Sequence, residues 1–269
     1  MNAPGDTRSE TTLPILIRED EAGVTTLTLN RPSQFNSLSE EMLVELQAAL
    51  NAIAADNTVR AVVIAGAGKA FCAGHDLKQM RANPSKAYQQ KLFKQCGKVM
   101  MTLTEMPQPV IARIHGIATA AGCQLVAMCD LAVAADGAKF AVSGVNLGLF
   151  CSTPSVALGR AMGRKQAMEM LLTGDFIDAA EAQRRGLVNR VVPLEQLDAE
   201  VKKLTDSICG KSPVAVGMGK QMFYKQLEMG LDGAYQLAAE TMACNMMAED
   251  AAEGIDAFIQ KRKPEWKGC

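Results

Sequence analysis

Two short stretches of the sequence, 71–77 (FCAGHDL) and 118–125 (ATAAGCQL), combine small residues with groups that could take part in chemistry. Each follows an apolar segment and leads into a predicted helix. Backbone N–H groups at a helix start have no intrahelical acceptor and carry the positive end of the helix dipole. Two such starts facing each other could stabilise a developing oxyanion. Small residues would equally let a helix pack closely on a strand, so the residues alone leave both interpretations open.

Two side chains could supply further chemistry. His75 is the residue of these stretches that can exchange protons near pH 7, although it could equally be a structural histidine bonded to a neighbour. Cys151 could be a nucleophile with His75 as its base, which would give thioester hydrolysis. The apolar flank of Cys151 favours instead a buried, inert thiol.

Several other motifs are incomplete. In the glycine-rich stretch 65–74 the lysine is followed by alanine, so the phosphate-loop frame fails. The chain contains no G-x-S-x-G elbow of serine hydrolases and no H-E-x-x-H frame. Cys72, His75 and Cys123 lack a second pair of ligands, and we predict no metal site.

Apolar segments typical of strands alternate with segments typical of helices, which predicts an α/β fold. Strands are predicted at 15–20, 24–30, 59–68, 109–118 and 131–136. Helices are predicted at 37–56, with Ser39 as N-cap, and at about 86–106, 122–129 and 154–170. After about residue 197 the strand signals stop, and helices separated by Gly and Ser-Pro breaks follow.

The composition is that of a globular protein without a strong charge. Of its 269 residues 48% are hydrophobic, and the net charge of −1 gives no general attraction to nucleic acid or anionic membranes. The eight cysteines form no CxxC pair, which suggests reduced thiols. Neither a membrane-spanning apolar run nor a signal-peptide apolar region occurs. We therefore predict a cytoplasmic protein with no nucleic-acid or membrane partner.

Five segments, in this order and spacing, resemble the crotonase (enoyl-CoA hydratase/isomerase) superfamily over nearly the whole chain. They are LNRPSQFNSLSEEM (29–42), AFCAGHDLKQM (70–80), residues 107–136, residues 168–192 and FIQKRKPEW (258–266). The resemblance implies a crotonase-type spiral of repeated β-β-α units with a C-terminal helical trimerisation region, as a homo-trimer or hexamer. On this basis the chain divides into a disordered lead (1–12), a core with the acyl-CoA site (13–200) and a helical region for oligomerisation and CoA contact (201–269).

The resemblance also implies an acyl-CoA thioester as substrate, with coenzyme A as part of the substrate and no separate cofactor. Carried over by residue, the thioester oxygen would accept hydrogen bonds from the backbone N–H groups of His75 and Ala121. The remaining residues assigned to substrate and CoA binding are Asp76, Lys78 near the CoA phosphates, and Phe258 and Lys261 at the adenine end, often across a subunit boundary.

The chain departs from the family where its hydratases carry two glutamates. Gln124 and Gly144 stand at those positions, and residues 137–168 contain no acid at all. Glutamine cannot take a proton from water at neutral pH, and loss of a general base typically costs about 10²–10⁴-fold in rate. Ordinary two-glutamate hydration is therefore not expected of these residues.

Three alternatives follow. The chain could be an enzyme of the hydratase/isomerase class (lyase or isomerase) in fatty acid metabolism that keeps the oxyanion hole and uses another group, for example His75. It could be a non-catalytic acyl-CoA-binding or regulatory protein. It could also have thioesterase-like activity through Cys151 or an oriented water.

Overall fold

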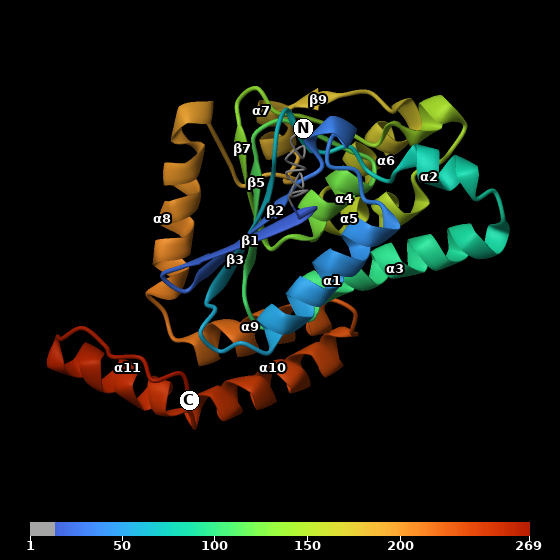
Figure 1. Ribbon diagram of the computed structural model, residues 1–269. Helices are drawn as coiled ribbons and strands as arrows, with labels where there is room; N and C mark the ends of the chain where they lie inside the picture. The colour runs from blue at the N-terminus through green and yellow to red at the C-terminus, as the bar shows by residue number, and fades with distance from the viewer. Residues whose placement is uncertain (1–13) are drawn as a thin grey trace, which may run out of the picture.

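The computed structural model describes residues 14–269, and the predicted disordered lead over 1–12 lies outside these residues. Two sheets form the core (Figure 1). In the six-stranded sheet, β1 pairs antiparallel with β2, and the other neighbours are parallel. Its strands are, in spatial order, β1 (Leu16–Glu21), β2 (Val24–Leu29), β3 (Ala61–Gly66), β5 (Val110–Ile114), β7 (Leu131–Ala135) and β10 (Arg190–Val192). The four-stranded sheet consists of β4 (Ala70–Cys72), β6 (Ile117–Thr119), β8 (Lys139–Ala141) and β9 (Ile177–Asp178).

Successive units of the chain repeat one pattern. Each adds a strand to the larger sheet, then a strand to the smaller sheet, and then a helix. These units are β3-β4-α2 (α2, Leu77–Ala82), β5-β6-α4 (α4, Ala121–Met128) and β7-β8-η2-α5 (η2, Ser143–Leu147; α5, Ser152–Ala161). This arrangement confirms the predicted α/β fold of β-β-α units. Its consequence is that the segments after β4 and β6, which are parallel neighbours, leave the smaller sheet side by side.

The helices of the core begin at recognisable signals. The N-cap Ser39 of α1 accepts a hydrogen bond from the backbone N of Met42 at 3.2 Å, as predicted. Ser85 and Asp178 cap their helices in the same way. The helical segments up to residue 209 are η1 (Pro32–Gln34), α1 (Glu40–Ala54), α2 (Leu77–Ala82), α3 (Lys86–Glu105), α4 (Ala121–Met128), η2 (Ser143–Leu147), α5 (Ser152–Ala161), α6 (Arg164–Thr173), α7 (Ala179–Arg184), η3 (Leu194–Gln196) and α8 (Leu197–Cys209).

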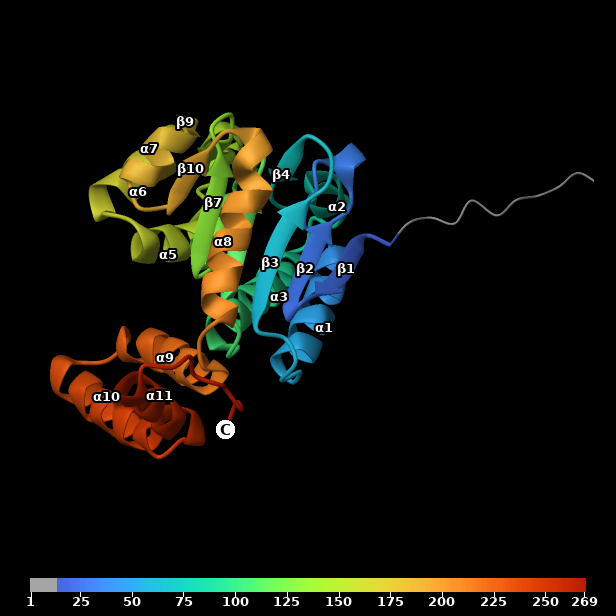
Figure 2. The same ribbon diagram turned by 90° about the vertical axis from the view of Figure 1, so that its left-hand side faces the viewer.

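Helices cover both faces of the six-stranded sheet. Because successive strand residues point to opposite faces, Val63 and Ile111 pack against Leu197 and Val201 of α8 on one face. Val62 and the other intervening strand residues join the main core with α1, α3 and α4 on the other face. Figure 2 shows α8 lying across the sheet. A sheet covered on both faces explains the continuous apolar runs of its strands.

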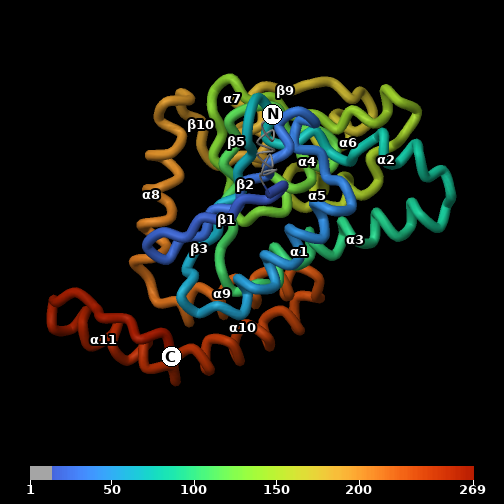
Figure 3. Tube along the Cα trace, in the orientation of Figure 1, coloured from blue at the N-terminus to red at the C-terminus, as the bar shows by residue number. Residues whose placement is uncertain are grey.

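The C-terminal helices form a separate group below the core, as the trace in Figure 3 shows. They are α9 (Pro213–Gln226), α10 (Leu231–Met246) and α11 (Glu249–Gln260). Lys220 of α9 connects them to the core. Its Nζ donates to the carbonyl oxygens of Leu103 (2.7 Å) and Gln108 (2.8 Å) and pairs with Asp130 (2.7 Å). All three ammonium N–H groups thus have acceptors, which is what a buried lysine requires.

Two predicted elements differ from the structure. The predicted strand 109–118 is two strands in different sheets, because the chain turns at His115 and Gly116. The predicted helix 154–170 is α5 and α6, because the chain is extended at Met162 and α6 starts anew with Gly163 as N-cap. Within residues 14–269 no helix has the length and apolar character needed to cross a bilayer.

Candidate functional site

The two stretches singled out in the sequence lie against each other in the structure. Gly74, between β4 and α2, has a φ of +90°, which favours glycine. A Cβ built at Gly74 would lie 2.9 Å from the Cβ of Ala120 and 3.1 Å from the backbone N of Ala121. Thr119 joins the segments further, since its Oγ1 donates to the carbonyl of Ala73 at 3.0 Å. The helix starts that follow β4 and β6 therefore meet at one junction.

Two backbone N–H groups at this junction are available. Among residues 14–269, neither the N–H of His75 nor that of Ala121 donates to an acceptor. Ala121 is the first residue of α4, where no intrahelical acceptor exists. Ala120 before it has φ +49° and ψ −120°, a conformation that costs a non-glycine residue about 1–3 kcal/mol. The fold thus holds a strained residue at the point where the N–H of Ala121 is presented.

Close packing explains the small residues as well. A Cβ at Gly122 would lie 2.0 Å from the carbonyl oxygen of Cys72, and one at Gly116 would lie 2.4 Å from that of Lys69. Any side chain at Gly122 would push the β5-β6-α4 unit away from β4. A side chain at Gly116 would push the same unit away from the turn that precedes β4. The two interpretations of the sequence are therefore compatible: small residues bring the segments together, and the same approach places the N–H groups at one junction.

His75 is held by its surroundings. Its Nδ1 lies 3.3 Å from the carbonyl oxygen of Leu38, and its ring meets Phe93 edge-on with centroids 5.4 Å apart. Because a carbonyl only accepts, Nδ1 carries the proton, and Nε2 is left as an acceptor. That Nε2 is buried and has no partner within the described chain. Burial lowers the pKa of His75, so the ring is neutral near pH 7.

Gln124 lies one turn into α4 from Ala121 and is only 4% exposed. Its Oε1 is a second buried acceptor without a partner among residues 14–269. A buried acceptor without a hydrogen bond costs about 1–3 kcal/mol. Such an atom is satisfied when a water or a polar ligand group donates to it.

Gly144, at the other expected glutamate position, has no room for a side chain. A Cβ there would lie 2.6 Å from the carbonyl oxygen of Leu149 and 2.7 Å from the Sγ of Cys151. The backbone N of Leu149 also donates to the carbonyl of Gly144 at 2.9 Å, which closes a loop onto this residue. The chain around residue 144 is thus built around glycine and does not merely lack a carboxyl group.

Cys151 does not have the character of a nucleophile. It is 9% exposed, and burial raises the pKa of its thiol. A raised pKa reduces the thiolate that would attack a thioester. Within residues 14–269, no cluster of three or more His, Cys, Asp or Glu side chains could hold a metal ion.

The residues assigned to CoA binding lie at two separate helices, α2 and α11. Asp76 caps α2 through the backbone N groups of Lys78 and Gln79, and its carboxylate pairs with Arg31 at 3.3 Å. Lys78 lies exposed on α2. The ion pair between Arg31 and Asp76 was not predicted from the sequence, although Arg31 lies in the matching segment 29–42.

Phe258 is 85% exposed at the end of α11, and Lys261 follows as its C-cap. Figure 1 places α11 and α2 at opposite ends of the molecule. One chain does not bring Phe258 and Lys261 to the junction of His75 and Ala121.

The sequence profile of the family described as Enoyl-CoA hydratase/isomerase matches residues 19–269. The chain belongs to this family. A Mus musculus relative named "Enoyl-CoA hydratase domain-containing protein 3, mitochondrial" is 46% identical over 98% of this chain and 87% of its own length. The Xenopus laevis protein of the same name is also 46% identical, over 94% of this chain and 86% of its own.

Solved structures of family members share the fold. The enoyl-CoA hydratase of Mycobacterium smegmatis matches with a TM-score of 0.93 and 59% identity, covering 94% of this chain and 99% of that one. Human enoyl Coenzyme A hydratase domain-containing protein 3 matches with a TM-score of 0.91 and 45% identity, covering 94% and 100%. These likenesses extend through the core and the C-terminal helices of the family fold.

The predicted cytoplasmic location is wrong by this comparison, because family relatives at 46% identity are named mitochondrial. The prediction rested on the lack of a signal-peptide apolar region. That region directs secretion, whereas import into mitochondria uses segments of a different, amphipathic and Arg-rich kind.

Proposed function

We propose that this family member binds an acyl-CoA thioester and polarises its carbonyl with the backbone N–H groups of His75 and Ala121. The observation that carries the proposal is the contact of Gly74 with Ala121, which brings the two unpartnered donors to one junction. Two fixed donors aimed at one carbonyl oxygen stabilise the negative charge that develops there, and one such donor is worth about 10²–10³ in rate.

The proposed activity excludes ordinary two-carboxylate hydration. An amide stands at Gln124, and the loop that closes on Gly144 leaves no space for an acid. His75 has an acceptor at Nε2 that has no partner among residues 14–269, and its imidazole could move a proton. If the protein is an enzyme, we therefore propose that His75 acts as its base.

The second candidate is a protein that binds acyl-CoA without turning it over. The absence of a carboxyl group at both positions favours it, since the two acids of hydration have no replacement there. A thioesterase with Cys151 as nucleophile is the least supported alternative, because burial raises the pKa of that thiol.

The remaining contacts to CoA belong to the same proposal. Lys78 would pair with the CoA phosphates, next to Asp76 at the start of α2. Phe258 and Lys261 would reach the adenine end of a CoA bound by another subunit, since they lie at the end of α11 and this helix is at the opposite end of the molecule from α2 (Figure 1). The proposal thus includes a homo-trimer or hexamer, and it needs no cofactor beyond the CoA portion of the substrate.

A melting screen against free CoA, acetyl-CoA, crotonyl-CoA and 3-hydroxybutyryl-CoA tests the proposal, followed by mass analysis of each mixture. At 100 times the dissociation constant, a ligand stabilises the fold by about 2.7 kcal/mol. Every CoA ester should stabilise more than free CoA, which has no thioester carbonyl. Equal stabilisation by all four would contradict the carbonyl contact, and a product heavier by one water would contradict the loss of hydration.

The variant Ala121→Pro removes the N–H of one proposed donor at the first position of α4, directly after Ala120 with its φ of +49°. It should abolish the preference for esters over free CoA. Arg164→Pro, at the first residue of α6, is the matched control and should keep that preference. Circular dichroism establishes that both variants are folded.

A further inference from the structure

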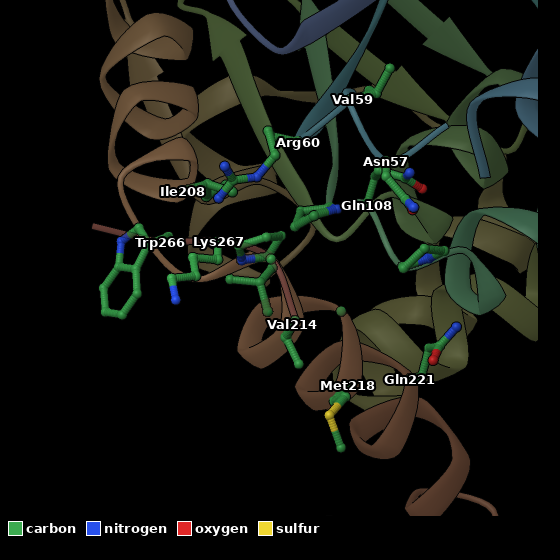
Figure 4. A pocket seen from close by; sticks show the side chains of 16 residues that line it. Asn57, Val59, Arg60, Gln108, Ile208, Val214, Met218, Gln221, Trp266 and Lys267 are labelled. Carbon is green, nitrogen blue, oxygen red and sulfur yellow. The ribbon is translucent and has the colours of Figure 1, made fainter. Parts of the chain in front are cut away.

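A groove lies at the joint between the core and the C-terminal helices, and the proposed acyl-CoA site does not include it. Its volume is about 470 Å³, within the range of small-molecule sites. Figure 4 shows its walls: Arg60 before β3, Gln108 before β5, residues of α9 and the C-terminal tail. These residues lie at the amino ends of β3 and β5, whereas the junction of His75 and Ala121 follows β4 and β6 at the other end of the core.

Two cationic side chains line the groove, and each has an acidic residue close by: Asp250 near Arg60 and Glu249 near Lys267. Arg60 and Lys267 line it, and none of its lining residues is acidic. One guanidinium nitrogen of Arg60 donates to the carbonyl of Lys211, and its other N–H groups donate to no acceptor within the described chain. The ammonium of Lys267 is 3.1 Å from Glu249, but its side chain is 69% exposed and can turn. An anionic group in the groove would therefore find donors from two sides.

The same wall of the groove contains a buried hydrogen-bond acceptor. Gln108 is 5% exposed, and its Nε2 donates to the carbonyl oxygens of Ile53 (2.8 Å) and Asp56 (3.2 Å). These two bonds fix the amide so that Oε1 is its acceptor end. That Oε1 is buried and has no partner among residues 14–269. An unpaired buried acceptor is costly, and a ligand that donates a hydrogen bond to it would remove that cost.

Most of the remaining lining is apolar, and Asn57 and Gln221 add polar side chains to it. Pro107, Pro109 and Pro213 contribute fixed backbone, and Val214 and Met218 of α9 add apolar side chains. A ligand therefore needs an apolar body as well as its polar groups.

The tail that closes the groove is anchored. The buried carboxylate of Asp250 accepts from the backbone N groups of Lys267 (2.7 Å) and Gly268 (3.1 Å) and from the Oγ of Ser212 (2.6 Å). Trp266 donates from its indole N to the carbonyl of Gly210 at 2.9 Å. The tail is thus a fixed wall, and little ordering would be needed for a ligand to bind.

We propose that this groove binds a small organic carboxylate that carries one N–H donor and an apolar body, such as an N-acylated amino acid. The carboxylate pairs with Arg60 and Lys267, the N–H donates to Gln108, and the apolar body lies on the prolines and α9. Such a ligand touches the core, α9 and the tail at once. It therefore stabilises the attachment of the C-terminal helices to the core.

The chain offers a direct probe, because Trp266 in the groove wall is its single tryptophan. N-acetyl-leucine is titrated while tryptophan fluorescence is followed, with calorimetry on the same samples. We expect a saturable change with a dissociation constant of about 1 mM or below, as for a fragment-sized ligand. Absence of saturable binding in both measurements would overturn the proposal.

Two analogues and three variants test the contacts. N-acetyl-leucinamide lacks the carboxylate and 4-methylpentanoate lacks the N–H, and each should bind about tenfold more weakly or worse. Arg60→Met and the exposed Lys267→Met should each weaken N-acetyl-leucine to a similar degree. Lys263→Met, on the same tail outside the lining, should change nothing. Binding that is equal for the amide, or unchanged in both Arg60→Met and Lys267→Met, would refute the charge complementarity.

Discussion

Gly144 offers a sharp test of how the site is built, because the structure gives the cost of its smallest substitution. In Gly144→Ala the new methyl would lie 2.6 Å from the carbonyl oxygen of Leu149 and 2.7 Å from the Sγ of Cys151. Cys151 could rotate, but the carbonyl of Leu149 can move only with its loop. Overpacking of this kind typically costs about 1–3 kcal/mol.

The free energy of unfolding is measured by urea titration of wild type and Gly144→Ala. Gly159→Ala is the matched control: Gly159 lies nearby on the exposed side of α5, and a Cβ there meets nothing within 4 Å. Alanine at this helical position should raise stability by about 0.5–1 kcal/mol. The two variants should therefore differ by roughly 1.5–4 kcal/mol in opposite directions from wild type.

If Gly144→Ala is as stable as wild type, the loop 144–151 has room for a side chain. The reasoning that the chain around residue 144 is built around glycine would then fail, and a glutamate at residue 144 would become a realistic substitution. A crystal structure of Gly144→Ala with an unmoved Leu149 would lead to the same conclusion.

Three further predictions concern groups that the structure buries. Lys220→Met leaves Asp130 without its cationic partner, so the free energy of unfolding should fall by about 3–5 kcal/mol, whereas the exposed Lys225→Met should stay within about 0.5 kcal/mol of wild type. Burial lowers the pKa of His75, so the unfolded chain takes up a proton first, and stability should fall as the pH drops below about 6.5. Urea titrations at pH 7 and pH 5.5 should show a smaller loss for His75→Gln, and an unchanged loss would contradict this assignment. Gln124→Glu alone should give no efficient hydration in a crotonyl-CoA absorbance assay, because the second carboxyl group is still absent. Hydration at the rate of a two-glutamate enzyme would refute that expectation.

Much of the fold could be predicted from neighbouring residues in the sequence. Helix starts at Ser39 and near residue 86 follow from capping groups and apolar periodicity, which act over a few residues. The break at Gly116 was missed because a short turn between two apolar strands leaves the local pattern continuous. The break at Gly163 was missed because both halves of the segment favour a helix.

The candidate site could be predicted only in part. Local pattern and family resemblance identified His75, Ala121, Gln124 and Gly144 as positions of interest. The packing around these residues could not be predicted in the same way. The enclosure of Gly144 depends on how a loop folds back onto it, and a glycine in a sequence does not reveal whether space surrounds it.

The sequence by itself determined the alternation of apolar strands with helices, the helical C-terminal region and the absence of acids from 137–168, because these are properties of the chain read in one dimension. Tertiary structure alone decided which distant groups meet. Lys220 reaches Asp130 across 90 positions, and Arg60, Gln108 and Lys267 line one groove. Such contacts depend on the packing of whole elements, and burial then sets their hydrogen bonds and charges, which no local pattern encodes.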